Sequence, residues 1–102
     1  MSIKKLYHPN KKSCKVTFTL PRKAARDRNT VHIVGEFNNW DTYASQLKQQ
    51  NNGAFSGTLT LEAGREYQFR YLIDETIWEN DDGADRYVPT PFGNSENSVV
   101  SI

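Results

Sequence analysis

The chain has 102 residues, which gives room for one small hydrophobic core but not for two domains. Its longest apolar runs are three residues, which excludes a membrane-spanning helix, and its single cysteine excludes an internal disulfide. The net charge is +1, but the first 28 residues hold nine of the 13 basic residues and one of the 12 acidic ones.

Short stretches of alternating apolar and polar residues indicate β-strands along the chain. Residues 1–13 are polar and Lys-rich, and predict a flexible basic tail or a short edge segment. The predicted strands that follow are residues 15–20, 31–34, 55–61, 65–73, 77–79 and 98–102. The segments between them predict one helical turn and several loops, at residues 22–28, 42–53, 80–85 and 88–94. Six or seven short strands predict an all-β domain in residues 14–102, an antiparallel β-sandwich of immunoglobulin-like architecture.

A loop with two large aromatic side chains follows the second predicted strand. Residues 35–41 read Gly-Glu-Phe-Asn-Asn-Trp-Asp, and the Gly and the Asn pair favour a turn out of the sheet. Phe37 has no polar group, so we expect it to cap the core. Trp40 lies beside amide side chains, and a flat apolar ring with hydrogen-bonding groups at its edge is what a sugar-stacking site needs. A core position for Trp40 is an equal alternative.

Four landmarks in order suggest a family. They are the loop at residues 35–40, the turn and aromatic strand at residues 62–74, Trp78, and the Gly- and Asn-containing stretch at residues 92–100. With them the chain, from about residue 14 to its end, resembles the family 48 carbohydrate-binding modules. These are early-set, immunoglobulin-like domains of isoamylases, of glycogen branching enzymes and of the β-subunits of AMP-activated protein kinase. The turn before Trp78 and the stretch from Gly93 to Asn97 are each longer than in that pattern.

The resemblance implies a set of sugar-binding residues. In the family, two tryptophans stack on the glucan, a basic residue on the long strand donates hydrogen bonds, and apolar and amide groups lie just before the last strand. The corresponding residues here are Trp40, Trp78, Arg70, Phe92, Asn97 and, as the alternative amide, Asn94. The implied function is non-catalytic binding of α-glucans such as glycogen, starch or maltooligosaccharides, without metal or cofactor.

An enzyme is not expected. The sequence shows no nucleophile–base pair, phosphate-binding loop or zinc spacing. A glycoside hydrolase family 13 label could still be inherited from related multidomain enzymes. A separate glycogen-metabolising enzyme is the protein partner that such a module would serve. The first ten residues lack the apolar run of a secretory signal, so the expected location is the cytoplasm, away from membranes.

Other interpretations stay open at this point. Early-set sandwiches also serve as protein-interaction or regulatory modules without a sugar site, and this interpretation would lead if either tryptophan were buried. The basic first 28 residues could bind nucleic acid, but a solvated face is favoured because these bases are scattered over unlike segments. Four acidic side chains could hold Ca²⁺, although a solvated acidic loop is favoured; they are Glu79, Asp81, Asp82 and Asp85.

Overall fold

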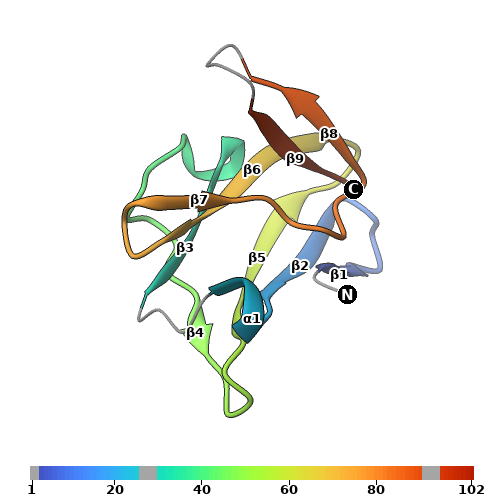
Figure 1. Ribbon diagram of the computed structural model, residues 1–102. Coiled ribbons are helices and arrows are strands. Elements are labelled where there is room, and N and C mark those ends of the chain that lie inside the picture. The colour runs from blue at the N-terminus through green and yellow to red at the C-terminus, as the bar shows by residue number, and fades with distance from the viewer. Residues whose placement is uncertain (1–2, 26–29, 91–94) are drawn as a thin grey trace.

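The computed structural model describes residues 3–25, 30–90 and 95–102, which form two antiparallel β-sheets packed face to face (Figure 1). One sheet has the strand order β1-β2-β5-β4, and the other has the order β3-β6-β9-β8, with β7 paired to β6 outside this order. The predicted immunoglobulin-like β-sandwich is therefore confirmed. The elements are β1 (Ile3–Tyr7), β2 (Ser13–Leu20), α1 (Arg22–Ala25), β3 (Val31–Gly35), the 3₁₀ turn η1 (Glu36–Asn38), β4 (Lys48–Gln49), β5 (Phe55–Glu62), β6 (Glu66–Ile73), β7 (Ile77–Glu79), β8 (Arg86–Pro89) and β9 (Glu96–Ser101).

The hydrophobic core lies between the two sheets and follows the two-residue period of their strands. Alternate side chains of β2 are buried, and Phe18 from this strand meets Phe69 from β6 with ring centroids 5.0 Å apart. Each buried ring of this kind contributes roughly 1.5–3 kcal/mol by leaving water. Phe37 packs against the same cluster, with its ring centroid 5.8 Å from that of Phe18. The prediction that Phe37 caps the core is therefore confirmed.

Strand β6 is central to the second sheet, and its outward-facing row forms the floor of one face of the molecule. Side chains that alternate with the buried row point outward. Arg70 of this row lies opposite Val34 of β3, and Leu72 lies opposite Trp78 of β7. Gln68 occupies the same row two residues before Arg70. This face of the sheet therefore collects side chains from three adjacent strands.

Three segments differ from the predicted tail and loops. Of the two alternatives for residues 1–13, the edge segment is present, because β1 pairs antiparallel with β2 along its whole length. The loop predicted at residues 42–53 contains β4, and the loop predicted at residues 88–94 is wrong over residues 88–89, which belong to β8. Pro89 is tolerated because β8 is an edge strand, where one side of the backbone needs no N–H donor.

The prediction of a solvated acidic loop is wrong for Asp81, which is buried. Its Oδ2 accepts a hydrogen bond of 2.6 Å from the Tyr71 hydroxyl, and its Oδ1 accepts one of 2.7 Å from the Gly83 N–H. Burial, and next the Asp81 charge, raise the pKa of Tyr71 far above its ordinary value. Asp81 thus fastens the segment after β7 to the interior of the sandwich.

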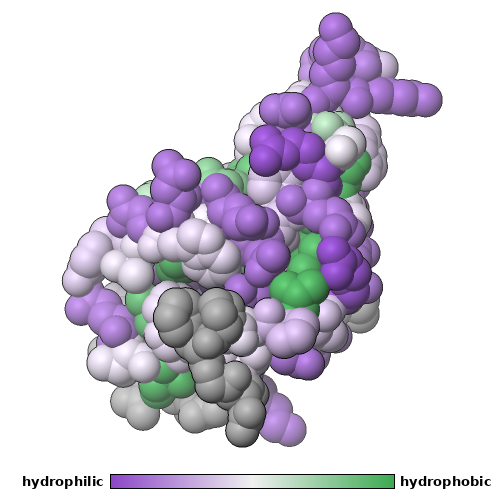
Figure 2. Space-filling model, turned by 90° about the horizontal axis from the view of Figure 1, so that it is seen from above, coloured by the Kyte–Doolittle hydropathy of each residue, from purple (hydrophilic) through white to green (hydrophobic). Residues whose placement is uncertain are grey.

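One face of the molecule, seen in Figure 2, is mainly polar. Seen from above, the face in Figure 2 carries mostly hydrophilic residues, and the hydrophobic residues form small, separate groups. Within residues 3–25, 30–90 and 95–102, no helix has the length and apolar character needed to cross a membrane. Over the same ranges, no group of three or more His, Cys, Asp and Glu side chains is placed to hold a metal ion.

Candidate functional site

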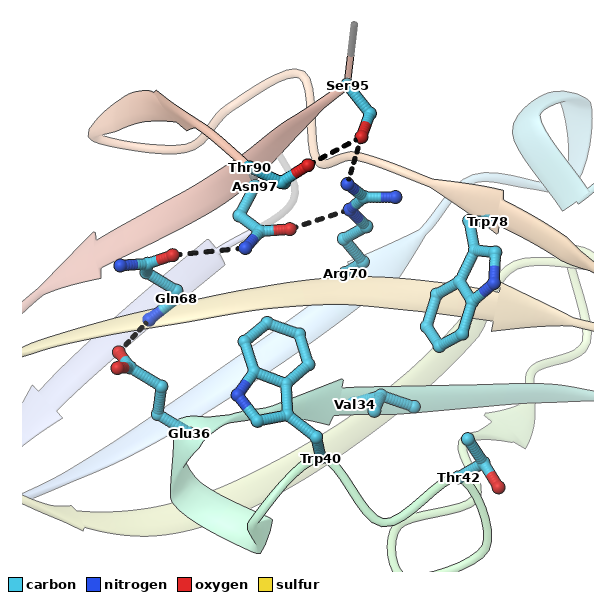
Figure 3. A pocket seen from close by; sticks show the side chains of 10 residues that line it. All are labelled: Val34, Glu36, Trp40, Thr42, Gln68, Arg70, Trp78, Thr90, Ser95 and Asn97. Atoms are coloured by element: carbon cyan, nitrogen blue, oxygen red, sulfur yellow. Dashed lines mark hydrogen bonds between the residues drawn. The ribbon is translucent and has the colours of Figure 1, made fainter. Parts of the chain in front are cut away.

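A groove of about 630 Å³ lies on the outer face of the sheet that contains β6 (Figure 3). Its floor comes from β3 and β6. Its walls come from η1 and the loop after it, from β7, from β9, and from Thr90 and Ser95, which adjoin β8 and β9. The residues that line it are Val34, Glu36, Trp40, Thr42, Gln68, Arg70, Trp78, Thr90, Ser95 and Asn97.

The loop after β3 places Trp40 in this groove through an unusual backbone. Asn39 and Trp40 have φ values of 57° and 58°, so two successive residues adopt the left-handed conformation. A non-glycine residue in this region costs of order 1–2 kcal/mol. The Trp40 N–H donates to the Gly35 carbonyl at 2.8 Å, which closes the loop. As a result Phe37 points into the core while Trp40, three residues later, points outward.

Two further residues make this loop possible. The side chain of Asn38 accepts a hydrogen bond from the Gly35 N–H at 3.0 Å and donates one to the Ile33 carbonyl at 3.0 Å. A Cβ atom at position 35 would lie 2.5 Å from the Gln68 carbonyl oxygen and 2.7 Å from Cβ of Phe69. Only glycine fits this close approach of β3 to β6.

Trp78 reaches the same groove from an edge strand. The turn before it has two left-handed residues, Asp74 and Glu75, with φ values of 48° and 64°. Asp74 anchors the turn because its Oδ1 accepts a hydrogen bond from the Thr30 N–H at 2.9 Å. The turn is longer than in the family pattern, but its extra length does not change the strand pairing. Strand β7 still pairs with β6, and Trp78 lies opposite Leu72.

Both indole rings are partly open to solvent. Trp40 is 38% exposed and Trp78 is 44% exposed. Figure 3 shows both side chains on the same side of the sheet, with Arg70 on the strand between them. The alternative in which Trp40 belongs to the core is therefore wrong. Two large apolar rings held at the surface of one groove form a binding surface for a ligand with flat apolar faces.

The guanidinium of Arg70 is held in a fixed orientation beside the rings. Its Nε donates to Oδ1 of Asn97 at 2.7 Å, and its Nη2 donates to Oγ of Ser95 at 2.9 Å. Ser95 is in turn 2.8 Å from the hydroxyl of Thr90. Because a guanidinium has five N–H groups, these two bonds leave further donors for a ligand.

A second part of the network continues along the groove. Nδ2 of Asn97 donates to Oε1 of Gln68 at 3.0 Å, and the backbone N–H of Gln68 donates to Oε1 of Glu36 at 2.6 Å. The polar side of the groove is thus one connected chain of hydrogen bonds from Glu36 to Ser95, as Figure 3 shows. Such a chain orients its members before any ligand arrives.

Among the residues that the structure describes, the groove offers binding groups but no pair of acid–base residues. Glu36 is the one carboxylate among the described residues that line it, whereas hydrolysis of a glycosidic bond requires two. A large shift of a carboxyl pKa is found outside the groove, at Glu66. There, hydrogen bonds from Arg86 and Ser101 lower the pKa to about 2, in an exposed structural contact.

The structure brings together four of the six residues named from the sequence. Trp40, Trp78, Arg70 and Asn97 all line the groove. Phe92 and Asn94 lie outside the described residues. Six lining residues were not predicted as site residues from the sequence; they are Val34, Glu36, Thr42, Gln68, Thr90 and Ser95. The two-residue period of β6 could have identified one of them, Gln68, as a neighbour of Arg70 on the same face.

The chain matches the family model of the glycogen recognition site of AMP-activated protein kinase over residues 8–100. It belongs to this family. Glycogen-recognition domains are binding modules and not enzymes. No individual curated protein matches the chain significantly.

Proposed function

We propose that this glycogen-recognition domain binds a stretch of α-1,4-glucan in the groove between Trp40 and Trp78, without chemistry. The observation that carries the proposal is the pair of half-exposed indole rings on one face, with an oriented guanidinium beside them. Glucose units of an α-1,4 chain present C–H faces that pack on indole rings and hydroxyl groups that need hydrogen-bond partners. Glycogen, starch and maltooligosaccharides all supply this pattern.

The expected affinity is modest. A fully covered aromatic side chain buries roughly 150–250 Å². At about 25 cal/mol per Å², two such rings give several kcal/mol of gross binding free energy, before the cost of ordering the sugar and the loops. We therefore expect micromolar or weaker affinity for a short oligosaccharide. A polymer raises the apparent affinity because it offers many sites to one or more domains.

The polar residues of the groove have distinct proposed roles. The N–H groups of Arg70 that Asn97 and Ser95 leave unused donate to sugar hydroxyls. Asn97 supplies an amide and fixes the guanidinium. From the resemblance alone, Phe92 packs against the rim of the sugar chain, and Asn94 is the alternative amide.

A stacking role for both tryptophans is tested by substitution. Trp40→Ala and Trp78→Ala should each lower the affinity for maltoheptaose by at least about tenfold and abolish retention on glycogen, because each removes one platform. Leu6→Ala is the matched control, since Leu6 is an exposed apolar residue, 69% accessible, on the other sheet. Unchanged retention in both tryptophan variants, with the fold intact by circular dichroism, would contradict the proposal.

A domain of this kind suits the recruitment of a separate glycogen-metabolising enzyme to its polymer. We propose that the sugar site serves this recruitment, in the cytoplasm. The supporting observation is that the groove lies on one sheet, so that a sugar bound there would leave the outer face of the other sheet uncovered for contact with a protein. Co-sedimentation with glycogen of an enzyme that does not bind glycogen alone, dependent on this domain and lost with Trp78→Ala, would support it.

A further inference from the structure

We propose that Gln68 and Glu36 form a second polar contact in the groove, which binds two neighbouring hydroxyl groups of the glucose unit that stacks on Trp40. This inference rests on the proposed function and goes beyond it by naming two sugar-contacting side chains. It also assigns them a ligand group, a vicinal diol.

The orientation of the Gln68 amide follows from the network. A guanidinium can only donate hydrogen bonds, so Arg70 requires the oxygen of the Asn97 amide to face it, at 2.7 Å. The nitrogen of Asn97 then faces Gln68 and donates to Oε1 at 3.0 Å. Nε2 of Gln68 is thereby directed away from Asn97, as Figure 3 shows. Two N–H donors are thus held in a groove-lining side chain without a protein partner in the described part of the chain.

The Glu36 carboxylate is bonded to the backbone N–H of Gln68, the residue that carries this amide, for a structural reason. Strand β3 ends at Gly35, which pairs with Phe69, so the next N–H of β6, that of Gln68, has lost its strand partner. Oε1 of Glu36 takes that place at 2.6 Å. One carboxylate oxygen is thus fixed by the backbone, and the exposed side chain keeps a second oxygen that can accept hydrogen bonds from a ligand.

A donor and an acceptor placed side by side suit a vicinal diol. Each sugar hydroxyl donates one hydrogen bond and accepts others, so neighbouring hydroxyls are satisfied by one N–H donor and one carboxylate oxygen. Hydrogen bonds to a carboxylate are stronger than those between neutral groups. An α-1,4 linkage leaves the 2- and 3-hydroxyls of each glucose unit unsubstituted. Arg70 provides donors only, so Glu36 supplies an acceptor that the guanidinium cannot provide.

Gln68→Glu tests the donor role. The variant keeps an oxygen that accepts from Asn97 but replaces the two N–H groups by an acceptor beside Glu36. Its affinity for maltoheptaose should fall by about tenfold or more, because the sugar would face two acceptors and no donor. Gln49→Ala is the control, since Gln49 is an exposed glutamine on β4, in the other sheet. Its affinity should equal that of the unchanged protein.

The side-chain amide signal of Gln68 in ¹⁵N spectra distinguishes a direct contact with the sugar from a positioning role. This signal is identified by its absence in Gln68→Glu and should shift on titration with maltoheptaose. If the indole signals of Trp40 and Trp78 shift while the Gln68 amide signal stays in place, the inference is overturned and the proposed function stands. If maltoheptaose moves no signal, both fail.

Glu36→Gln tests the acceptor role and keeps an oxygen for the Gln68 N–H. This variant should weaken binding with little change in melting temperature, and unchanged binding would overturn the part assigned to Glu36.

Discussion

Trp40 and Trp78 reach one groove by different means. Trp40 is held outward by its own left-handed backbone, which the side chain of Asn38 stabilises from within the loop. Trp78 is placed by strand pairing, opposite Leu72. Strained backbone of this kind is typical of functional sites, where many surrounding contacts hold a residue in a conformation that is otherwise unfavourable. At the scale of the residue, Trp40 is therefore the more sensitive of the two to changes outside the groove.

Asn38→Ala should both destabilise the domain and weaken sugar binding. Its side chain bonds the Gly35 N–H, the Ile33 carbonyl and the Ser45 hydroxyl, so its loss leaves partly buried groups without partners. We expect a loss of roughly 1–3 kcal/mol in the free energy of unfolding, measured by urea denaturation. Asn51→Ala, in an exposed turn of the same chain, is the control and should change the stability little. Wild-type stability and affinity in the Asn38 variant would rule out this account of the loop.

At the scale of the element, short strands complete the sheet around β6. Strands β7 and β9 bring Trp78 and Asn97 to the groove. The edge strand β8 carries Arg86, which bonds Glu66 at the start of β6. Ser101 at the end of β9 donates to the same carboxylate at 2.7 Å. Glu66 thus ties three adjacent strands together on the exposed side of the sheet.

The stability supplied by Glu66 should depend on pH. Its pKa falls from an ordinary value of 4.5 to about 2 in the folded protein, so its charged form is favoured by folding. The contribution is therefore present above about pH 4.5 and is lost as the pH falls through about 2. Urea midpoints measured between these pH values should decline less steeply for Glu66→Gln than for the unchanged protein. The contact is exposed, so the effect should shrink at high salt.

Glu62→Gln is the control for that series, because Glu62 is an exposed carboxylate at the end of a strand in the other sheet. Its curve should run parallel to that of the unchanged protein. If Glu66→Gln also gives a parallel curve, the assignment of pH dependence to Glu66 is wrong.

Alternation in the sequence predicted the long strands and the sandwich, because a buried face imposes a two-residue period on residues such as Phe18 and Phe69. It did not predict β4 or β8. These two strands are short and almost wholly exposed, so they show no alternation of buried and exposed residues, and their pairing is decided by the neighbouring strand. The buried Asp81 was also missed, since its partner Tyr71 lies ten residues away and only the folded chain shows the contact.

The candidate site was predicted in part. The resemblance named both tryptophans, Arg70 and Asn97, and the structure brings these four together. The connections among the polar residues could not be predicted, because they depend on register: Gln68 of β6 meets Asn97 of β9 only in the observed pairing of those strands. The roles of these residues in binding stay predictions.

At the scale of the whole molecule, the groove and the basic strands belong to different sheets. The groove lies on the sheet of β3, β6, β9 and β8, whereas Lys4, Lys5 and Lys15 belong to β1 and β2 of the other sheet. Lys5 is moreover paired with Asp85 at 2.8 Å. These basic residues from the start of the sequence therefore lie on the sheet that does not carry the groove. Sugar binding should accordingly depend little on salt, in contrast to the steep dependence of nucleic-acid binding.

The most direct test follows the two indole N–H signals of the two tryptophans in ¹⁵N spectra during titration with β-cyclodextrin, at about 50 and 500 mM salt. The account predicts that both signals shift with one shared dissociation constant, which changes less than about twofold between the two salt concentrations. A titration in which only one indole signal moves, or neither does, would contradict a sugar site built on both rings.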